Sequence, residues 1–219
     1  MSEGGSSNVR KTVAIIAILW LVVMLVVIFI YYALNFTQYM DTVRDEQTAL
    51  SSAPAPRNFM LMSSEFGEGE SIPSKYTCDQ PAQAGDTQIS PPLSIDGVPT
   101  ETKSLVLIME DRDLPKNLVR DGIFLHWVLF NIPPQTSEIA AGASVGIAGT
   151  SGNGVAGYMG PCPPPQYEPR EHTYHFDLYA LDASLDLPEG ARVEDVRASM
   201  EGRVIQQTTL TGTYQRREK

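Results

Sequence analysis

The chain contains few of the residues that do proton chemistry near neutral pH. Among its 219 residues only three are histidine, at positions 126, 172 and 175, and only two are cysteine, at positions 78 and 162. Two cysteines cannot build a disulfide scaffold or a four-cysteine zinc site. Because histidine is the side chain that ordinarily titrates near neutral pH, these three positions decide what acid–base chemistry is available.

Positive charge is also in the minority. The 16 Lys and Arg stand against 26 Asp and Glu, a net charge of −10, which argues against nucleic acid as a partner. The sequence also lacks the Gly-Lys-Ser/Thr of a nucleotide-binding P-loop and the His-Glu-x-x-His spacing of many zinc enzymes. The hydrophobic fraction of 42% is too high for a disordered chain, and the length suits one domain with an appendage.

One long hydrophobic run lies near the N-terminus. Residues 12–34 contain no charged side chain, and as a helix they would be about 34 Å long, enough to cross a hydrocarbon core of about 30 Å. A cleaved signal peptide is the alternative, but its apolar part is usually only about 7–15 residues long and ends in small residues. This run ends in Ile30, Tyr31 and Tyr32, which suit the membrane interface, so we expect an uncleaved transmembrane helix.

The charges around this run predict its orientation. Arg10 and Lys11 precede it, whereas acidic residues predominate over 41–46. The positive-inside tendency therefore predicts a cytoplasmic tail over 1–11 and a single-pass protein of the cell membrane whose C-terminal part is extracytoplasmic.

The rest of the chain divides into two parts by composition. Residues 35–57 are largely polar and end in a Ser/Ala/Pro stretch, so we expect a semi-extended linker there. Residues 58–219 carry most of the acidity and are expected to form one folded domain.

The domain has the pattern of a mostly β protein. Four segments show short apolar runs, period-two alternation or many β-branched residues, and the last of them is one strand or two: 104–109, 123–132, 174–181 and 204–214. One helix is expected over 193–201, with Gly202 as its stop. Strands joined by long Pro/Gly loops, with one late helix, indicate an antiparallel β-sandwich.

Three clusters carry candidate chemistry. The acidic segment 110–115 (EDRDLP) follows the first strand, where facing water is the ordinary explanation. His126 lies beside Trp127 in an apolar strand, where a buried structural histidine is common. The loop 157–165 (GYMGPCPPP) is rich in glycine, which permits close backbone approach, and in proline, which fixes the loop; the segment 172–174 (HTY) follows it.

Taken together and in this order, these motifs resemble the phosphatidylethanolamine-binding protein family, which includes the Raf kinase inhibitor proteins, and above all its bacterial and archaeal branch. The resemblance covers nearly all of residues 60–215 and leaves the hydrophobic run and the linker outside. The matching stretches are SSEFGEGESIPSKYTCD (63–79), SPPLSIDGVP (90–99), SLVLIMEDRDLP (104–115), FLHWVLFNIPP (124–134), GYMGPCPPP (157–165) and HTYHFDLYALD (172–182).

The resemblance implies a β-sandwich with a small, shallow, rigid pocket at one end that accepts phosphate-type anions or phospholipid headgroups. The family's pocket positions correspond here to ten residues: Asp111, Asp113, Pro115, His126, Gly160, Pro161, Pro163, Pro164, His172 and Tyr174.

These side chains form a coherent set of hydrogen-bond donors. His126 and His172 can offer ring N–H groups, and Tyr174 offers a phenolic O–H. Asp111 would be a poor anion ligand, so we expect it to accept a hydrogen bond from the far ring nitrogen of a histidine. His175 is left out because it points to the opposite face of its strand from His172 and Tyr174.

Two positions depart from the family pattern. Arg112 stands where the family has proline, and Thr173 stands where it has an arginine that helps to brace the pocket. Arg112 or Arg170 would have to substitute for that arginine. For Cys78 and Cys162, both a disulfide and two buried free thiols are compatible with the sequence.

Three functional hypotheses follow. The first is a membrane-anchored module that binds a small anion, without enzymatic activity, cofactor or metal. The second is a regulator of another protein, similar to relatives that inhibit kinases or a protease, with an unknown partner. The third is a hydrolase or metal-dependent enzyme that uses Asp111, His126 and His172.

Overall fold

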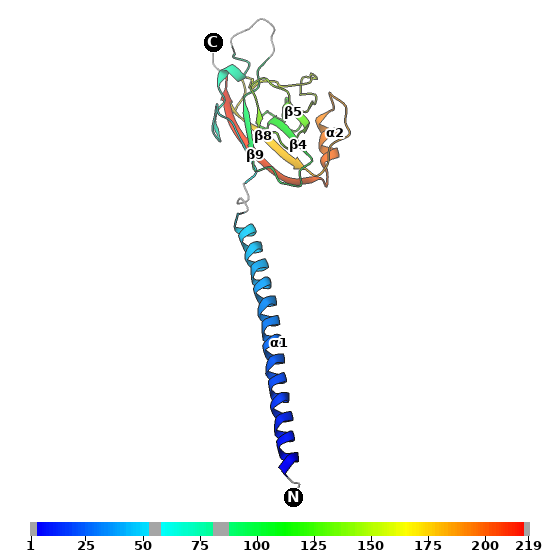
Figure 1. The fold of residues 1–219 in the computed structure, drawn as a ribbon. Coiled ribbons are helices and arrows are strands. Elements are labelled where there is room, and N and C mark those ends of the chain that lie inside the picture. The colour runs from blue at the N-terminus through cyan, green and yellow to red at the C-terminus, as the bar shows by residue number, and fades with distance from the viewer. Residues whose placement is uncertain (1–3, 53–57, 81–87, 217–219) are drawn as a thin grey trace. The chain divides into compact units, whose positions relative to one another are not determined.

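The computed structural model describes residues 4–52, 58–80 and 88–216 (Figure 1). The chain separates into two compact units, Met1–Ala55 and Pro56–Lys219. The first unit contains a single long helix over its described residues, and the second is a domain made mostly of sheet.

The helix of the first unit is α1 (Gly4–Ser52). Its stretch Leu19–Arg44, with 26 residues and a mean hydropathy of 2.4, is long and apolar enough to cross a membrane. The side chains of this stretch are exposed, and no side of the helix is distinctly polar. The N-terminal apolar helix is therefore a candidate anchor.

The expected linker is largely helical instead. Residues 35–52 continue α1, and 53–57 lie outside the described residues. Neither proline nor glycine interrupts the chain between the apolar run and Pro54, so the helix can propagate through this polar stretch. Thr37 and Thr42 do not break the helix because their hydroxyls donate to main-chain carbonyls one turn earlier, at 2.8 and 2.7 Å.

Over its described residues the domain forms two sheets. The three-stranded sheet has the order β1-β3-β6: β1 (Met60–Met62), β3 (Leu93–Asp96) and β6 (Glu138–Ile139). The six-stranded sheet has the order β2-β9-β8-β4-β5-β7: β2 (Glu70–Ser71), β9 (Val204–Gln215), β8 (Glu171–Leu181), β4 (Ser104–Asp111), β5 (Phe124–Ile132) and β7 (Ile147–Ala148). Neighbouring strands are antiparallel except β2 and β9, which are parallel. Two helical elements complete the domain: the short 3-10 helix η1 (Ser74–Tyr76) and α2 (Val193–Met200).

The four predicted strands are the long strands of the six-stranded sheet. β4, β5, β8 and β9 contain them, and β9 is one continuous strand. The predicted helix is α2, and Gly202 follows it with a φ of +72°, as a helix stop requires. The mostly-sheet fold is confirmed.

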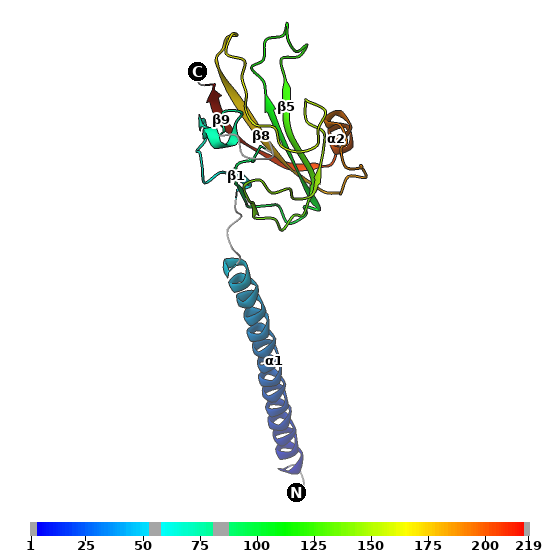
Figure 2. The same ribbon diagram turned by 90° about the horizontal axis from the view of Figure 1, so that it is seen from above.

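Apolar side chains cover both faces of the six-stranded sheet. Leu105, Leu107 and Met109 of β4 belong to a core that also contains side chains from the three-stranded sheet, whereas Val106 and Ile108 belong to a second core with α2. β4 is thus buried on both faces, which explains its continuous apolar sequence. Figure 1 shows α2 beside β4 and β5, and Figure 2 shows α2 beside β5.

Candidate functional site

Three neighbouring strands bring the predicted polar residues to one end of the large sheet. β4 ends at Asp111, which pairs in register with Phe124 at the start of β5 and with Tyr174 near the start of β8. His126 lies two residues along β5 from Phe124, and His172 lies two residues before Tyr174. Residues that are far apart in the sequence therefore become neighbours.

An irregularity in β5 aims His126 toward the core shared by the two sheets. The β4–β5 register shifts next to Met109, which pairs with Trp127 and leaves His126 as the extra residue. Strict alternation would put His126 and Trp127 on opposite faces, and a bulge of this kind reorients one of them. The His126 ring indeed contacts the ring of Tyr174, a residue of that core, at a centroid distance of 5.1 Å.

His172 and Asp111 form a buried pair. Nδ1 of His172 lies 2.6 Å from Oδ2 of Asp111, and the two residues are 0% and 3% exposed. Burial by itself would lower the pKa of His172, but the hydrogen bond to Asp111 and the charge of that carboxylate outweigh it and raise the pKa above its ordinary value. Asp111 thus makes the contact with a ring nitrogen that the sequence analysis expected.

His126 has a different environment. Its Nδ1 lies 2.8 Å from the main-chain carbonyl of Met159; since a carbonyl only accepts, Nδ1 carries a proton. Burial lowers the pKa of His126 more than the Met159 carbonyl and Asp111 raise it, so the neutral ring is favoured. The site therefore combines one imidazole that favours the charged form with one that favours the neutral form.

Two buried polar atoms on one face of β8 make no hydrogen bond of good geometry among the described residues: Nε2 of His172 and Oη of Tyr174, although the carbonyl of Pro169 lies near the His172 ring and Asp111 lies near the Tyr174 hydroxyl. Buried polar atoms in proteins are nearly always paired, so these two mark a place for a partner. Burial, together with the charge of Asp111, raises the pKa of Tyr174 above its ordinary value, so the phenol keeps its proton. A third such atom, Oγ1 of Thr102, lies just before the start of β4, at the end of the strand away from Asp111.

Asp113 braces the site through the main chain. Its carboxylate accepts a hydrogen bond from the backbone N–H of Thr173 at 2.7 Å, and its own N–H donates to Asp111 at 2.9 Å. Asp113 therefore fixes the segment after β4 to β8, between His172 and Tyr174.

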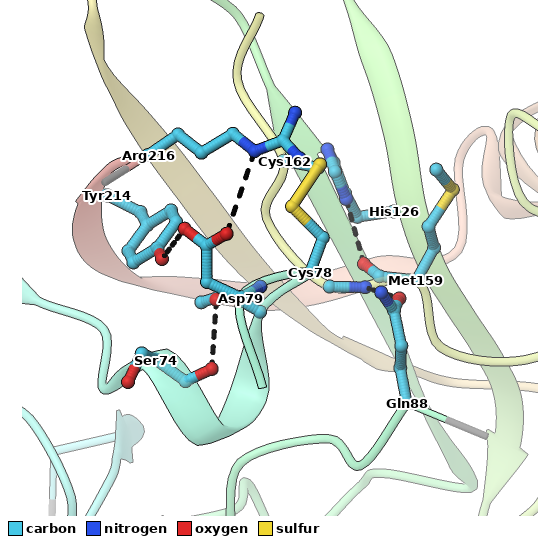
Figure 3. The surroundings of a disulfide bond; sticks show 11 residues. Ser74, Cys78, Asp79, Gln88, His126, Met159, Cys162, Tyr214 and Arg216 are labelled. Atoms are coloured by element: carbon cyan, nitrogen blue, oxygen red, sulfur yellow. Dashed lines mark hydrogen bonds and ion pairs between the residues drawn. A yellow bond between two sulfur atoms is a disulfide. The ribbon is translucent and has the colours of Figure 1, made fainter. Parts of the chain in front are cut away.

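The Gly/Pro loop packs closely against the segment after η1. A Cβ at Gly160 would lie 2.6 Å from the carbonyl oxygen of Tyr76, so only glycine permits this approach. The N–H of Gly160 donates to Oε1 of Gln88 at 2.6 Å, and the carbonyl of Pro161 accepts from the N–H of Cys78 at 3.0 Å. These contacts hold the loop in place, and Figure 3 shows Gln88, Met159 and Cys78 in this region.

A disulfide joins the same two segments. Cys78 and Cys162 are bonded, with their Cα atoms 5.4 Å apart. Of the two states that the sequence left open, the structure has the disulfide.

The remaining predicted prolines lie in two loops, Pro115 in the connection after β4 and Pro163 and Pro164 in the Gly/Pro loop. Pro115 begins a turn in which its carbonyl accepts from Leu118 at 2.8 Å, and the carbonyl of Pro164 accepts from Tyr167 at 3.3 Å. Pro163 is buried within its loop. A direct part for these three in binding a ligand stays a prediction.

A cavity of about 900 Å³ lies next to the site, between the segment after β4, the loop 150–154 and the start of α2. Neither His126 nor His172 lines it, but it is lined by Phe124, whose ring contacts that of His126 at 5.1 Å. The expected shallow hollow at the two imidazoles therefore stays a prediction.

The enzyme hypotheses gain little from the described residues. No group of three or more His, Cys, Asp and Glu is placed to hold a metal ion in this part of the chain. The stretch 142–146 (GASVG) matches the Gly-x-Ser-x-Gly pattern of serine hydrolases, which the reasoning from the sequence wrongly took to be absent. It lies in the loop between β6 and β7, however, whereas the hydrolase motif turns from a strand into a helix.

Comparison with known proteins places the domain in a family. A family model described as phosphatidylethanolamine-binding protein matches residues 62–215, most of the chain. The chain belongs to the phosphatidylethanolamine-binding protein family. This confirms the resemblance drawn from the sequence motifs.

Members of this family from distant organisms are similar to the chain. A UPF0098 protein of Chlamydia trachomatis is 41% identical over 157 residues, which cover 71% of this chain and 98% of that protein. A UPF0098 protein of Methanothermobacter thermautotrophicus is 42% identical over 163 residues, with coverage of 71% and 98%.

Two solved structures share the fold. A phosphatidylethanolamine-binding protein homologue from Chlamydia trachomatis has a TM-score of 0.66 and 40% identity, covering 73% of this chain and 98% of its own. YbcL of E. coli, described as a new member of the mammalian family, has a TM-score of 0.61 at 23% identity, covering 74% and 100%, and this likeness concerns the fold alone.

One departure from the phosphatidylethanolamine-binding protein pattern has a structural explanation. Arg112 bonds to Glu110 at 3.2 Å and to Asp177, on the face of β8 opposite His172. Arg112 therefore braces the second core face and does not substitute for the family's pocket arginine. Arg170 forms an ion pair with Glu168 at 3.3 Å.

Sequence reasoning missed two residues whose contacts involve a main-chain group, as acceptor or as partner. Met159 was part of a quoted motif, but nothing in its side chain indicates that its carbonyl fixes the tautomer of His126. Gln88 lies in no recognised pattern and was not considered, although its amide holds Gly160.

Proposed function

We propose that this phosphatidylethanolamine-binding protein family member is a membrane-anchored β-sandwich module that binds a phosphate-type anion, either free or as part of a phospholipid headgroup. The observation that carries the proposal is the pair of buried, unpartnered atoms on one face of β8, Nε2 of His172 and Oη of Tyr174. A ligand that accepts hydrogen bonds from both would remove two otherwise unpaired groups.

The charges favour an anion over a cation or an apolar group. Asp111 engages Nδ1 of His172 and raises the pKa of that ring, and in the protonated ring Nε2 carries a second donor proton. Tyr174 keeps its phenolic proton and is another donor. Donors on a charged group form stronger, shorter bonds to phosphate oxygens, whereas an apolar ligand would leave both atoms unpaired.

The proposal includes no covalent step. Both carboxylate oxygens of Asp111 already accept hydrogen bonds, Oδ2 from His172 at 2.6 Å and Oδ1 from the N–H of Asp113 at 2.9 Å. This supports a positioning role for Asp111 in place of a nucleophilic one.

The helix α1 would hold the anion site at the outer surface of the cell membrane. We propose that α1 crosses the cell membrane through its uncharged apolar residues 12–34, with the N-terminus in the cytoplasm and the domain outside. A tether of this kind keeps the site close to a surface rich in phospholipid headgroups, and it leaves free phosphate equally accessible.

Calorimetric titration of the full-length protein in a nonionic detergent tests the proposal. Inorganic phosphate and glycerophosphoethanolamine serve as the two ligands, and their relative affinity separates a phosphate site from a headgroup site. We expect millimolar or tighter binding of at least one of them.

Two histidine variants locate the binding. His172→Gln should weaken binding by about tenfold or more, because a hydrogen bond to a charged group is worth about 1.5–3 kcal/mol. His175→Gln, on the opposite face of β8, should leave the affinity unchanged. Equal losses in the two variants, or no heat with either ligand, would refute the site.

A further inference from the structure

The disulfide joins the loop that holds His126 to the segment that holds the end of β9, the strand beside His172 (Figure 3). Cys162 belongs to the loop that also contains Met159, and Cys78 is followed by Asp79. Met159 contacts one half of the site, and Asp79 is tied to the strand that supports the other half.

On one side, the loop holds His126. The carbonyl of Met159 accepts from Nδ1 of His126 at 2.8 Å, and the N–H of Met159 donates to the carbonyl of His126 at 2.9 Å. Only Gly160 and Pro161 separate Met159 from Cys162. A movement of Cys162 would therefore disturb the acceptor that orients this imidazole.

On the other side, Asp79 holds the end of β9. Its carboxylate accepts from Oη of Tyr214 at 2.6 Å and lies 3.6 Å from the guanidinium of Arg216. Tyr214 is the register partner of His172 across the β8–β9 pair. The disulfide thus closes a continuous set of contacts from His126 to the strand beside His172.

Besides this bond, the loop is held by hydrogen bonds between neutral groups and by the packing of Tyr158 against the core. The N–H of Cys78 donates to Pro161 at 3.0 Å, and Oη of Tyr158 donates to the carbonyl of Tyr76 at 2.7 Å. Such bonds contribute little net stability each, and residues 157–170 contain neither helix nor strand. A segment of this kind can open locally while the domain stays folded.

The disulfide lies outside the apolar cores of the domain. Neither Cys78 nor Cys162 belongs to the two apolar cores. Both cysteines are half-buried, and neither residue is fully enclosed.

We propose that the Cys78–Cys162 disulfide is a redox-sensitive clamp on the anion site: its reduction leaves the domain folded, loosens the loop 159–165 and weakens phosphate binding. The inference rests on the proposed anion site. It adds to that site a form of regulation by thiols.

The step is a thiol–disulfide exchange with a dithiol reductant. One thiolate of the reductant attacks a sulfur of the bond and forms a mixed disulfide, which releases one protein cysteine. The second thiolate of the reductant then displaces the other cysteine. Two electrons and two protons pass to the protein, which gains two thiols, and the reductant becomes a cyclic disulfide.

Phosphate titration of the full-length protein in nonionic detergent, before and after treatment with dithiothreitol, tests the clamp. Thiol labelling confirms the reduction. We expect the affinity to fall by about threefold to tenfold, which corresponds to a binding-competent loop that is populated about a third to a tenth of the time. The double variant Cys78→Ala, Cys162→Ala should bind as weakly as the reduced protein and should not respond to dithiothreitol.

The outcomes separate the two proposals. Equal phosphate affinity before and after confirmed reduction would overturn the clamp and leave the anion site standing. Binding of neither phosphate nor glycerophosphoethanolamine by the oxidised protein would overturn the proposed function and the clamp with it. Loss of near-UV circular dichroism or of cooperative melting on reduction would also overturn the clamp, because the bond would then support the fold as a whole.

Discussion

At the scale of single residues, two identical side chains acquire opposite properties from their neighbours. His172 faces a carboxylate, and its pKa is raised; His126 faces a main-chain carbonyl in a buried setting, and its pKa is lowered. Asp111 is thus the residue that favours the charged form of one imidazole. The difference could not be predicted from composition, because it depends on which acceptor each Nδ1 meets.

The unpartnered hydroxyl of Tyr174 leads to a stability prediction. Tyr174→Phe removes a buried polar atom without a partner, so the free energy of unfolding should be unchanged or higher, although phosphate binding should weaken. Tyr158→Phe is the matched control, because it removes the 2.7 Å hydrogen bond to Tyr76 and should cost about 0.5–1.5 kcal/mol. Denaturation of the full-length variants measures both; a larger loss in Tyr174→Phe would show that its hydroxyl has a partner.

At the scale of elements, the loop that forms the rim depends on one close approach. Gly160→Ala would place a methyl group 2.6 Å from the backbone oxygen of Tyr76, and relieving this overlap should cost about 1–3 kcal/mol. Gly67→Ala is the control, since its nearest neighbour is the flexible side chain of Glu70 at 3.1 Å. Thermal unfolding of the two variants checks the prediction, which fails if Gly160→Ala is as stable as Gly67→Ala.

The long elements were predictable because their patterns are local. β4 is buried on both faces and reads as an apolar run, β8 alternates, and α2 is marked by Gly202 at its end. The two-residue strands β2, β6 and β7 are too short to leave such a pattern. The prediction of a semi-extended linker was wrong where α1 continues to Ser52. The Ser/Ala/Pro composition was given more weight than the absence of helix breakers before Pro54.

The candidate site was predictable in part. Period-two alternation alone puts His172 and Tyr174 on one strand face and His175 on the other. His126 reaches that face only through the bulge next to Met109, which no sequence pattern indicates, so its place in the set came from the family resemblance. The acceptors that fix the site are main-chain or distant groups, and their contacts exist only in the folded domain.

At the scale of the whole molecule, a binding domain follows a helix long enough to cross a membrane. The predicted topology makes α1 an uncleaved anchor and the domain extracytoplasmic, which agrees with a disulfide between Cys78 and Cys162, since such bonds persist outside the reducing cytoplasm.

Fractionation of cells that produce the full chain tests this topology. The protein should stay with the membrane pellet after an alkaline carbonate wash, and a protease added to spheroplasts should degrade the domain. A variant that lacks residues 12–34 should lose its attachment to the membrane. Release of the intact chain by the wash, or protection of the domain from the protease, would contradict the anchor or its orientation.

The central claim is that a phosphate-type anion bonds to Nε2 of His172, and ¹⁵N-histidine NMR of the full-length protein measures this directly. Three histidines give three sets of signals, and His175 is an internal control. Protonation of His172 favours anion binding, so affinity should fall as pH rises through its raised pKa, and phosphate should move that titration to still higher pH. We predict that millimolar phosphate shifts the Nε2 signal of His172 and leaves His175 unchanged; an unperturbed His172 signal, or equal shifts at both residues, would contradict the account.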